Sequence, residues 1–196
     1  MKPLIVWDYD DVLYPMMEAW FIAAGRKIQS HVDHFKHISE NPPHNLMEIN
    51  LSKYYESLDR FRNSEQALAI APKNEITNWF RQNGGRYRHF VLTARPLHTL
   101  ESAQKWLNNF FPGVFEGFGF VPSQRPGHDL SQYHRSKREY LEKEELSCTY
   151  FVDDKVSTVN DVAEIQGVTA ITYPQPWNHA WENKASINEL LPRDEQ

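Results

Sequence analysis

Short apolar runs that end in polar residues are the feature that most constrains the fold of this chain. The run Leu4–Trp7 is continuous and apolar, which is typical of a strand buried on both faces. Similar runs occupy residues 90–92, 118–121, 150–152 and 169–172. Between them, residues 100–110 and 156–165 have apolar side chains at helical spacing. This alternation predicts an α/β fold with a Rossmann-like parallel sheet and helices on its faces.

One long segment interrupts this alternation directly after the first strand. No strand pattern is found between residues 14 and 71, where apolar residues predict one helix over 17–35 and another over 52–61. We therefore expect an α/β core made of residues 1–13 and 72–196, with residues 14–71 as a helical insertion. Because the insertion leaves the sheet at the end of a strand, we expect it to cover a site there.

Composition excludes several classes of protein. The 196 residues fit one domain with an insertion, and the single cysteine, Cys148, excludes an intramolecular disulfide, so we expect a reducing, cytoplasmic location. No apolar run approaches the roughly 20 residues of a membrane span. The formal net charge of -5 disfavours extended nucleic-acid binding. A small anionic partner remains possible if a metal ion or a local basic patch binds it, and the oligomeric state stays open.

Carboxylates follow two of the predicted strands. Asp8 and Asp10 come after the first strand and lie on one side of it if the strand conformation persists. Asp153 and Asp154 follow the fourth strand. Each pair alone is better explained by helix capping or a solvated loop start, which explains the combination poorly. Because carboxyl ends of parallel strands meet at one edge and paired carboxylates repel, the combination favours a Mg²⁺ site.

The order of these motifs along the chain resembles that of the haloacid dehalogenase superfamily. Its first motif is matched by Asp8-Tyr9-Asp10-Asp11-Val12-Leu13 after an apolar strand. Its second motif, a strand that ends in Thr or Ser, is matched at Thr93, and its third, a Lys that begins a helix, at Lys137. Its fourth motif is matched by Asp153-Asp154. The resemblance implies a haloacid dehalogenase-like (HAD-like) core, with residues 14–71 as a small C1-type cap.

The resemblance also implies a role for each matched residue. Asp8 would attack phosphorus and form an aspartyl-phosphate, and Asp10 would protonate the leaving oxygen and then activate water. Thr93 would donate a hydrogen bond to the substrate phosphate, whose charge Lys137 would neutralise. The implied Mg²⁺ ligands are the Asp8 carboxylate, the Asp10 backbone carbonyl and Asp153, with Asp154 either a direct ligand or a residue that orients the others. The implied activity is a Mg²⁺-dependent phosphatase, a phosphoric monoester hydrolase acting on a small molecule.

A looser resemblance concerns the substrate. Residues 151–155, 157–161 and 173–178 are similar to the 5'(3')-deoxyribonucleotidase group, although Asp11 replaces the Gly that is common there. This implies a 5'-nucleotidase acting on (deoxy)nucleoside monophosphates. The alternatives are a phosphatase of another small phosphate ester or of nucleic-acid 3'-ends, and a catalytically silent HAD-fold binding protein. The intact pair Asp8 and Asp10 argues against the silent protein.

Two further residues are candidate substrate contacts. Tyr14 follows the first motif closely, and its ring is able to stack on a base while its hydroxyl forms a hydrogen bond. We therefore expect Tyr14 to contact the substrate. Arg95 lies two residues after Thr93 and is predicted either to bind the substrate phosphate or to pair with a neighbouring carboxylate.

Overall fold

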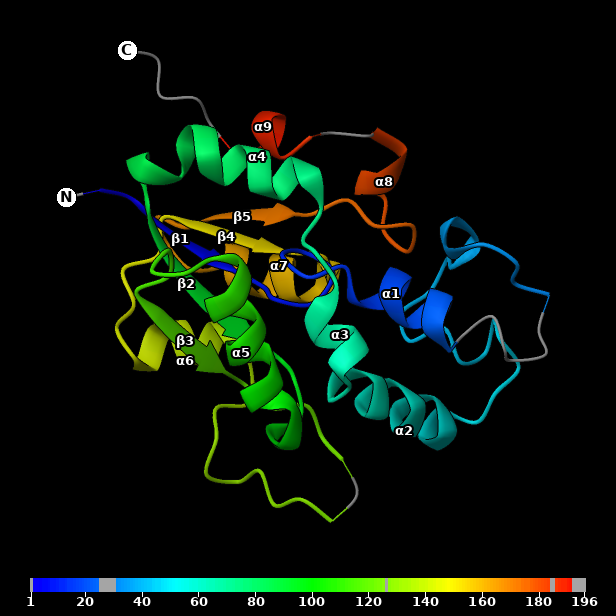
Figure 1. Cartoon of the computed structure of the whole chain (residues 1–196). Helices are drawn as coiled ribbons and strands as arrows, with labels where there is room; N and C mark the ends of the chain where they lie inside the picture. Colours follow the sequence, from blue (N-terminus) through cyan, green and yellow to red (C-terminus); the bar gives the residue numbers. More distant parts are fainter. Residues whose placement is uncertain (1, 25–30, 126, 184–185, 192–196) are drawn as a thin grey trace.

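A five-stranded parallel sheet forms the centre of the molecule, in the order β3-β2-β1-β4-β5 (Figure 1). The computed structural model describes residues 2–24, 31–125, 127–183 and 186–191. The strands are β1 (Leu4–Trp7), β2 (Arg88–Thr93), β3 (Gly117–Phe120), β4 (Tyr150–Asp153) and β5 (Thr169–Thr172). All five predicted strands are therefore confirmed, as is the α/β fold, because continuous apolar runs are what a doubly covered parallel sheet requires.

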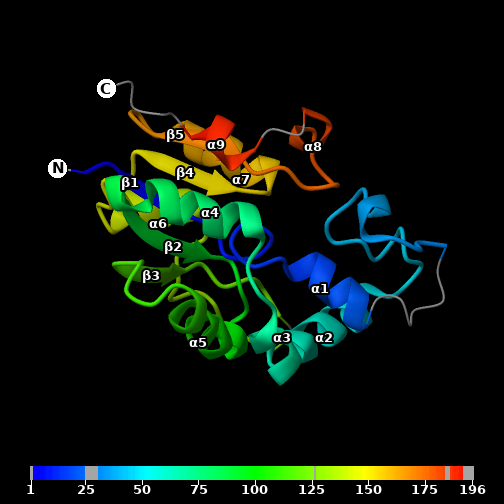
Figure 2. The same cartoon turned by 45° about the horizontal axis from the view of Figure 1, so that its top comes forward.

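Helices cover both faces of the sheet (Figure 1, Figure 2). Along β1, Ile5 and Trp7 belong to one apolar cluster, while Leu4 and Val6 belong to another, because successive strand side chains point to opposite faces. The first cluster includes side chains of α4 (Asn74–Asn83), α5 (Leu100–Phe110) and the short α9 (Ile187–Leu190). The second includes side chains of α6 (Lys137–Lys143) and α7 (Val156–Ala163). The predicted helices at 100–110 and 156–165 are thus confirmed as α5 and α7.

The segment 14–71 contains helices and, in its described parts, no strand. Its elements are α1 (Met16–Ala23), the 3-10 turn η2 (Phe35–His37), α2 (Leu51–Arg62) and α3 (Glu65–Ala69). α2 confirms the helix predicted over 52–61. Figure 1 shows these elements beyond the carboxyl ends of the strands. Near the other end of the chain lies α8 (Ala180–Asn183). None of the helices described is long and apolar enough to cross a membrane.

The single helix predicted over residues 17–35 is wrong. α1 ends at Ala23, and a new turn begins only at Phe35; residues 25–30 lie outside the described part of the chain. The ring of His34 accepts a hydrogen bond from the backbone N–H of Lys36 at 3.0 Å and so begins η2. Val32 is nevertheless buried, because a non-helical segment is also able to pack apolar side chains against the core.

The connections of β1 determine where a ligand is expected. From β1 the chain passes to β2 and β3 on one side of the sheet, and later to β4 and β5 on the other. The strand order therefore reverses between β1 and β4. In open α/β sheets the crevice outside the carboxyl ends at such a point is the usual ligand site. The acidic residues that follow β1 and β4 lie at this point.

Candidate active site

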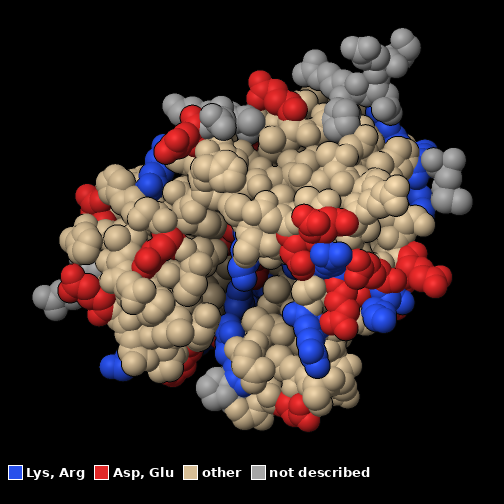
Figure 3. Space-filling model, turned by 180° about the vertical axis from the view of Figure 1, so that it is seen from behind, with Lys and Arg blue, Asp and Glu red and all other residues tan. Residues whose placement is uncertain are grey.

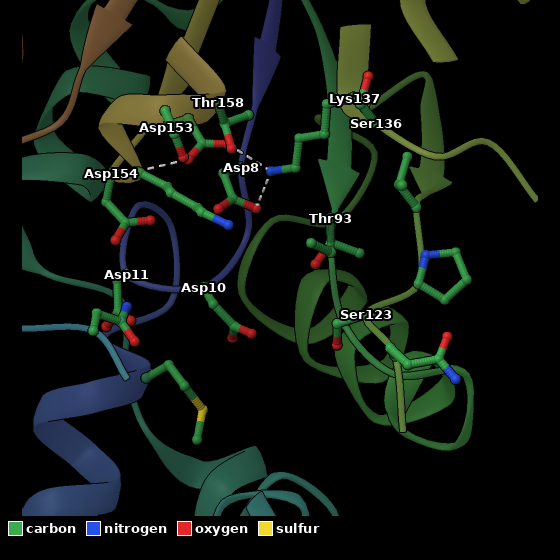
Figure 4. A pocket seen from close by; sticks show the side chains of 18 of the residues that line it. Asp8, Asp10, Asp11, Thr93, Ser123, Ser136, Lys137, Asp153, Asp154 and Thr158 are labelled. Carbon is green, nitrogen blue, oxygen red and sulfur yellow. Dashed lines mark hydrogen bonds and ion pairs between the residues drawn. The ribbon is translucent and has the colours of Figure 1, made fainter. Parts of the chain in front are cut away.

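A cavity of about 750 Å³ opens at the carboxyl edge of the sheet (Figure 4). Its lining from the α/β core includes Asp8, Asp10, Thr93, Lys137, Asp153 and Asp154. The segment 14–71 contributes Met16, Met17, Asn41, Tyr54, Leu58 and Arg62. The structure thus brings together all the residues predicted for this site except Tyr14 and Arg95.

Lys137 lies between two of the carboxylates. It begins α6, and the preceding Ser136 accepts a hydrogen bond from the backbone N–H of Glu139 at 3.1 Å, which caps the helix. Lys137 Nζ is 2.7 Å from Asp8 Oδ1 and 2.7 Å from Asp153 Oδ2. Burial lowers the pKa of Lys137, but Asp153 and Asp8 outweigh burial and raise it above its ordinary value. Lys137 is therefore a buried cation that holds Asp8 and Asp153 together.

Three buried carboxylates form a candidate metal site. Asp8, Asp153 and Asp154 each offer one oxygen within 4.8 Å of the others. Burial raises the pKa of Asp8 to about 7, although Lys137 opposes the shift. Burial and the charge of Asp153 also raise the pKa of Asp154. Three acids against one lysine leave an excess of negative charge, so this donor set fits a divalent cation with oxygen ligands such as Mg²⁺.

Two of these acids are also oriented by donors outside the cluster. Asp154 Oδ2 accepts a hydrogen bond from Trp177 Nε1 at 2.7 Å, and Asp153 Oδ1 accepts one from the backbone N–H of Lys155 at 2.8 Å. Neither donor was predicted to orient a carboxylate, although both lie in the segments 151–155 and 173–178 that the sequence analysis noted. They hold the carboxylates in place, and a carboxylate oxygen that accepts one hydrogen bond still has a second lone pair for a metal ion.

The Asp10 carboxylate lies outside this metal group and pairs with two arginines. Arg95 Nη2 donates to Asp10 Oδ1 at 2.8 Å, and Arg62 Nη2 donates to Asp10 Oδ2 at 2.8 Å. Burial alone would raise the pKa of Asp10, but Arg95 and Arg62 lower it below its ordinary value. Asp10 is therefore ionised in this arrangement. The predicted metal contact through its backbone carbonyl stays a prediction.

Arg95 takes the second of its two predicted alternatives, pairing with a neighbouring carboxylate. Its side chain is 2% exposed, and its guanidinium lies 4.5 Å from the ring centroid of Tyr9. Arg62 was missed from the sequence. The available signal was its spacing: Tyr54, Leu58 and Arg62 recur every four residues and therefore lie on one face of α2.

Tyr14 was expected to contact the substrate, but the structure places it in the core instead of the cavity. Its residue is 1% exposed, its ring is stacked on that of Tyr9 at 5.5 Å, and its hydroxyl donates to the carbonyl of Ala67 at 3.1 Å. The physical reason is the tight turn after the first motif. Asp11 has a φ of 63°, and the backbone N–H of Tyr14 bonds back to the carbonyl of Tyr9 at 2.9 Å. The turn directs Tyr14 into the core.

Hydroxyl groups line the cavity opposite the acids. Thr93 ends β2, is 1% exposed, and its Oγ1 accepts a hydrogen bond from the backbone N–H of Arg95 at 3.3 Å. Ser123 and Ser136, which the sequence did not single out, also line the cavity, and Figure 4 shows them on the same side as Thr93. The Thr93 hydroxyl hydrogen remains available to donate to a bound oxyanion.

Comparison with known proteins gives a likeness of fold. No protein-family model and no curated protein matches the sequence. A haloacid dehalogenase-like family hydrolase from Streptococcus pneumoniae is 12% identical, with a TM-score of 0.55 over 87% of this chain and 84% of that one. A hydrolase from S. pneumoniae TIGR4 is 16% identical, with a TM-score of 0.56 over 89% and 94%. A haloacid dehalogenase-like family hydrolase from Xanthomonas campestris is 14% identical, with a TM-score of 0.51 over 91% and 85%. The chain has the haloacid dehalogenase-like fold.

Proposed function

We propose that this chain is a Mg²⁺-dependent phosphomonoesterase that acts through an aspartyl-phosphate on Asp8. The observation that supports it best is the position of Lys137, which lies 2.7 Å from both Asp8, directly after β1, and Asp153, at the end of β4. Asp8 Oδ1 accepts from Lys137 Nζ and, at 2.6 Å, from the backbone N–H of Tyr9. Among the described residues, no donor binds Asp8 Oδ2, so this oxygen is free to act as the nucleophile.

The reaction has two displacements. In the first, the Asp8 carboxylate attacks phosphorus, the bond between phosphorus and the leaving oxygen breaks, and that oxygen receives a proton. In the second, water attacks the phosphorus of the aspartyl-phosphate and releases inorganic phosphate and free Asp8. Lys137 and the hydroxyl of Thr93 stabilise the negative charge on the phosphoryl oxygens. Mg²⁺ held by Asp8, Asp153 and Asp154 would supply further charge neutralisation.

Asp10 is the proposed acid and base. As an ionised carboxylate it is ready to accept a proton from water in the second displacement. To protonate the leaving oxygen in the first, it has to bind a proton, which its pairs with Arg62 and Arg95 oppose. These pairs therefore have to loosen during turnover.

The proposed substrates are nucleoside monophosphates or other small phosphate esters. The cavity volume of about 750 Å³ is within the usual range for sites that bind such molecules. The nucleotide proposal rests on the resemblance of residues 151–155, 157–161 and 173–178 to the deoxyribonucleotidase group. Tyr14 no longer supports it, because the ring is buried.

Phosphate release tests this function. The wild type is assayed on phenyl phosphate and on nucleoside 5'- and 3'-monophosphates, with Mg²⁺ and with a chelator. We expect turnover that requires Mg²⁺, and a loss of at least about 100-fold in kcat/KM for Asp8→Asn, which removes the nucleophile. Asp33→Asn is the matched control, since it makes the same change at an exposed carboxylate outside the cavity. Absence of phosphate release by a folded wild type, or undiminished release by Asp8→Asn, would contradict the proposal.

A further inference from the structure

Five alternating charges form a buried row beside the candidate active site. In order, the row contains Arg95, Asp10, Arg62, Asp59 and Arg125. Arg62 Nη1 is 2.9 Å from Asp59 Oδ1, and Arg125 Nε is 2.7 Å from Asp59 Oδ2. None of the five side chains is more than 17% exposed. The row connects the loops after β1, β2 and β3 with helix α2.

The charges of this row do not balance. Three arginines face two aspartates, so one positive charge is left over (3 - 2 = +1). His98, 3.5 Å from Asp59, adds no negative charge. Arg62 Nε is buried and has no hydrogen-bond partner among the residues that the structure describes. Since a buried charge without a counter-charge is costly, this region is built to receive an anion.

The row borders a pocket of about 440 Å³ that is continuous with the main cavity, because nine of its lining residues, among them Arg62 and Lys155, line both. The charged residues that line this pocket are Arg62, Arg125, Lys155 and Asp154. Lys155 is exposed and forms no ion pair within the described part of the chain. Figure 3 shows Lys and Arg side chains along a hollow of the surface.

Helix α2 supplies an apolar and a polar contact to the same pocket. Leu58 and Tyr54 line it, respectively one and two helical turns before Arg62, which ends α2. Among the described residues, the hydroxyl of Tyr54 has one weak contact, 4.0 Å from Met17 Sδ, so it is able to donate to a ligand. A ligand in this pocket would therefore meet positive charge, a hydroxyl donor and apolar side chains that include Leu58 and Val156.

We propose that this pocket binds a second anionic group, a phosphate or a carboxylate, on the leaving group of the substrate. The inference rests on the proposed phosphatase function and names its substrate class: phosphate esters that have two anionic groups. The transferred phosphate lies at Asp8 and Lys137, while the second group lies between Arg62 and Lys155. The main alternative is that the excess charge serves only to hold Asp10.

Binding to the Asp8→Asn variant separates these possibilities, because this variant removes the nucleophile and keeps the row intact. In the presence of Mg²⁺, calorimetry compares phenyl phosphate with its 3- and 4-carboxylated forms in one arm and with 1,3- and 1,4-phenylene bisphosphate in the other. We expect at least one doubly anionic ester, from one arm or the other, to have a Kd at least about fivefold lower than that of phenyl phosphate. The two arms distinguish a carboxylate from a second phosphate.

Lys155 provides the decisive variant, since an exposed, unpaired side chain is able to change without disturbing the fold. The quantity compared is the Kd of phenyl phosphate divided by the Kd of the doubly anionic ester that binds best. Adding Lys155→Gln to Asp8→Asn should bring this ratio of dissociation constants close to one, whereas Lys155→Arg should retain the preference. Lys53→Gln is the matched control: Lys53 is an exposed lysine of α2 outside the cavities described, and the ratio should stay unchanged.

The two possible failures are distinguishable. Binding of phenyl phosphate and of every doubly anionic ester with equal affinity would overturn the second-anion site and leave the phosphatase proposal standing. A preference that survives Lys155→Gln would also overturn it. Absence of both binding and phosphate release would overturn the two proposals together. Without turnover by the wild type, the ratio of dissociation constants still decides the second-anion site.

Discussion

Asp11 shows how one residue serves both the turn and the charge balance of the site. Its φ of 63° is in the left-handed region, which Asp tolerates better than most residues because its short polar side chain bonds locally. Here Asp11 Oδ1 accepts from the backbone N–H of Met17 at 2.8 Å and so helps to begin α1. Burial, followed by the charge of Asp10, raises the pKa of Asp11 to about 7.

This shift predicts a pH-dependent effect of Asp11→Asn. Between the ordinary pKa of 3.8 and the folded value of about 7, the folded protein holds a proton that the unfolded chain loses. The wild type therefore loses stability as pH rises through this window. Asn keeps the acceptor for Met17 without a charge. In metal-free protein, Asp11→Asn should raise the free energy of unfolding by up to about 4 kcal/mol at pH values above about 7, since one unit of pKa shift corresponds to about 1.4 kcal/mol.

Urea unfolding with a chelator, at about pH 4, 6 and 8, measures this difference. It should be small at the lowest pH, grow up to about pH 7 and stay constant above it. The same difference at every pH would mean that the Asp11 carboxyl does not titrate with a raised pKa.

Tyr14 provides a second prediction for a single residue. Tyr14→Phe removes the hydrogen bond to the carbonyl of Ala67, so we expect the free energy of unfolding to fall by about 1 kcal/mol. kcat/KM on the best phosphate ester should stay unchanged, since the ring is buried away from the cavity. Tyr9→Phe is the control: within the described residues the Tyr9 hydroxyl makes no hydrogen bond, although the two rings are stacked. A selective loss of nucleotide hydrolysis in Tyr14→Phe would restore Tyr14 as a substrate contact.

At the scale of elements, α2 determines how the segment 14–71 meets the sheet. The helix begins after Asn50, whose side chain accepts from the backbone N–H of Ser52 at 2.8 Å. One face contributes apolar and cavity-lining residues, and Asp59 on an adjoining side bonds Arg125 of the loop after β3. Charged pairs therefore attach α2 to the core, which makes this attachment sensitive to the loss of a single carboxylate.

Asp59→Asn tests this attachment. The change leaves Arg62 and Arg125 without their shared carboxylate, so we expect the free energy of unfolding to fall by about 3 kcal/mol. Glu56→Gln is the matched control on the same helix, where an exposed pair with Arg60 contributes little. Urea unfolding compares the two variants. Equal losses would show that the buried row does not stabilise the attachment of α2.

At the scale of the whole molecule, negative and positive charge are separated across one crevice. The acids after β1 and β4 exceed Lys137 in number, whereas the arginines of the row exceed their aspartates. A divalent cation and an anion are the ligands that balance these two regions. Both regions lie at the reversal of strand order, so binding there connects both halves of the sheet with the segment 14–71.

Mg²⁺ should therefore stabilise the folded molecule. At a concentration about 100 times its Kd, mass action predicts roughly 2.7 kcal/mol and a corresponding rise in Tm. Asp153→Asn should lower this Mg²⁺-dependent rise, because it removes one carboxylate of the cluster. Asp33→Asn, at an exposed carboxylate, should leave it unchanged. Thermal unfolding with increasing Mg²⁺ measures the effect. Equal rises of Tm in Asp153→Asn and in the wild type would show that Mg²⁺ binds at another site.

The sequence by itself determined the five strands, the helices α2, α5 and α7, and the edge of the sheet where the acids lie. Each of these follows from a pattern between near neighbours in the chain: a continuous apolar run, a helical spacing, or a polar residue where a run ends. The predicted helix over 17–35 shows the limit, because the apolar residue Val32 is buried without being helical.

Only the tertiary structure decided which charged side chains pair. Asp10 meets Arg62 across 52 positions of sequence and Arg95 across 85, and no local pattern predicts which long side chain reaches a given carboxylate. The burial of Tyr14 was decided in the same way, by a turn at Asp11 and by the carbonyl of Ala67. Local periodicity specifies elements, whereas the partners of a side chain depend on where the folded backbone brings distant segments together.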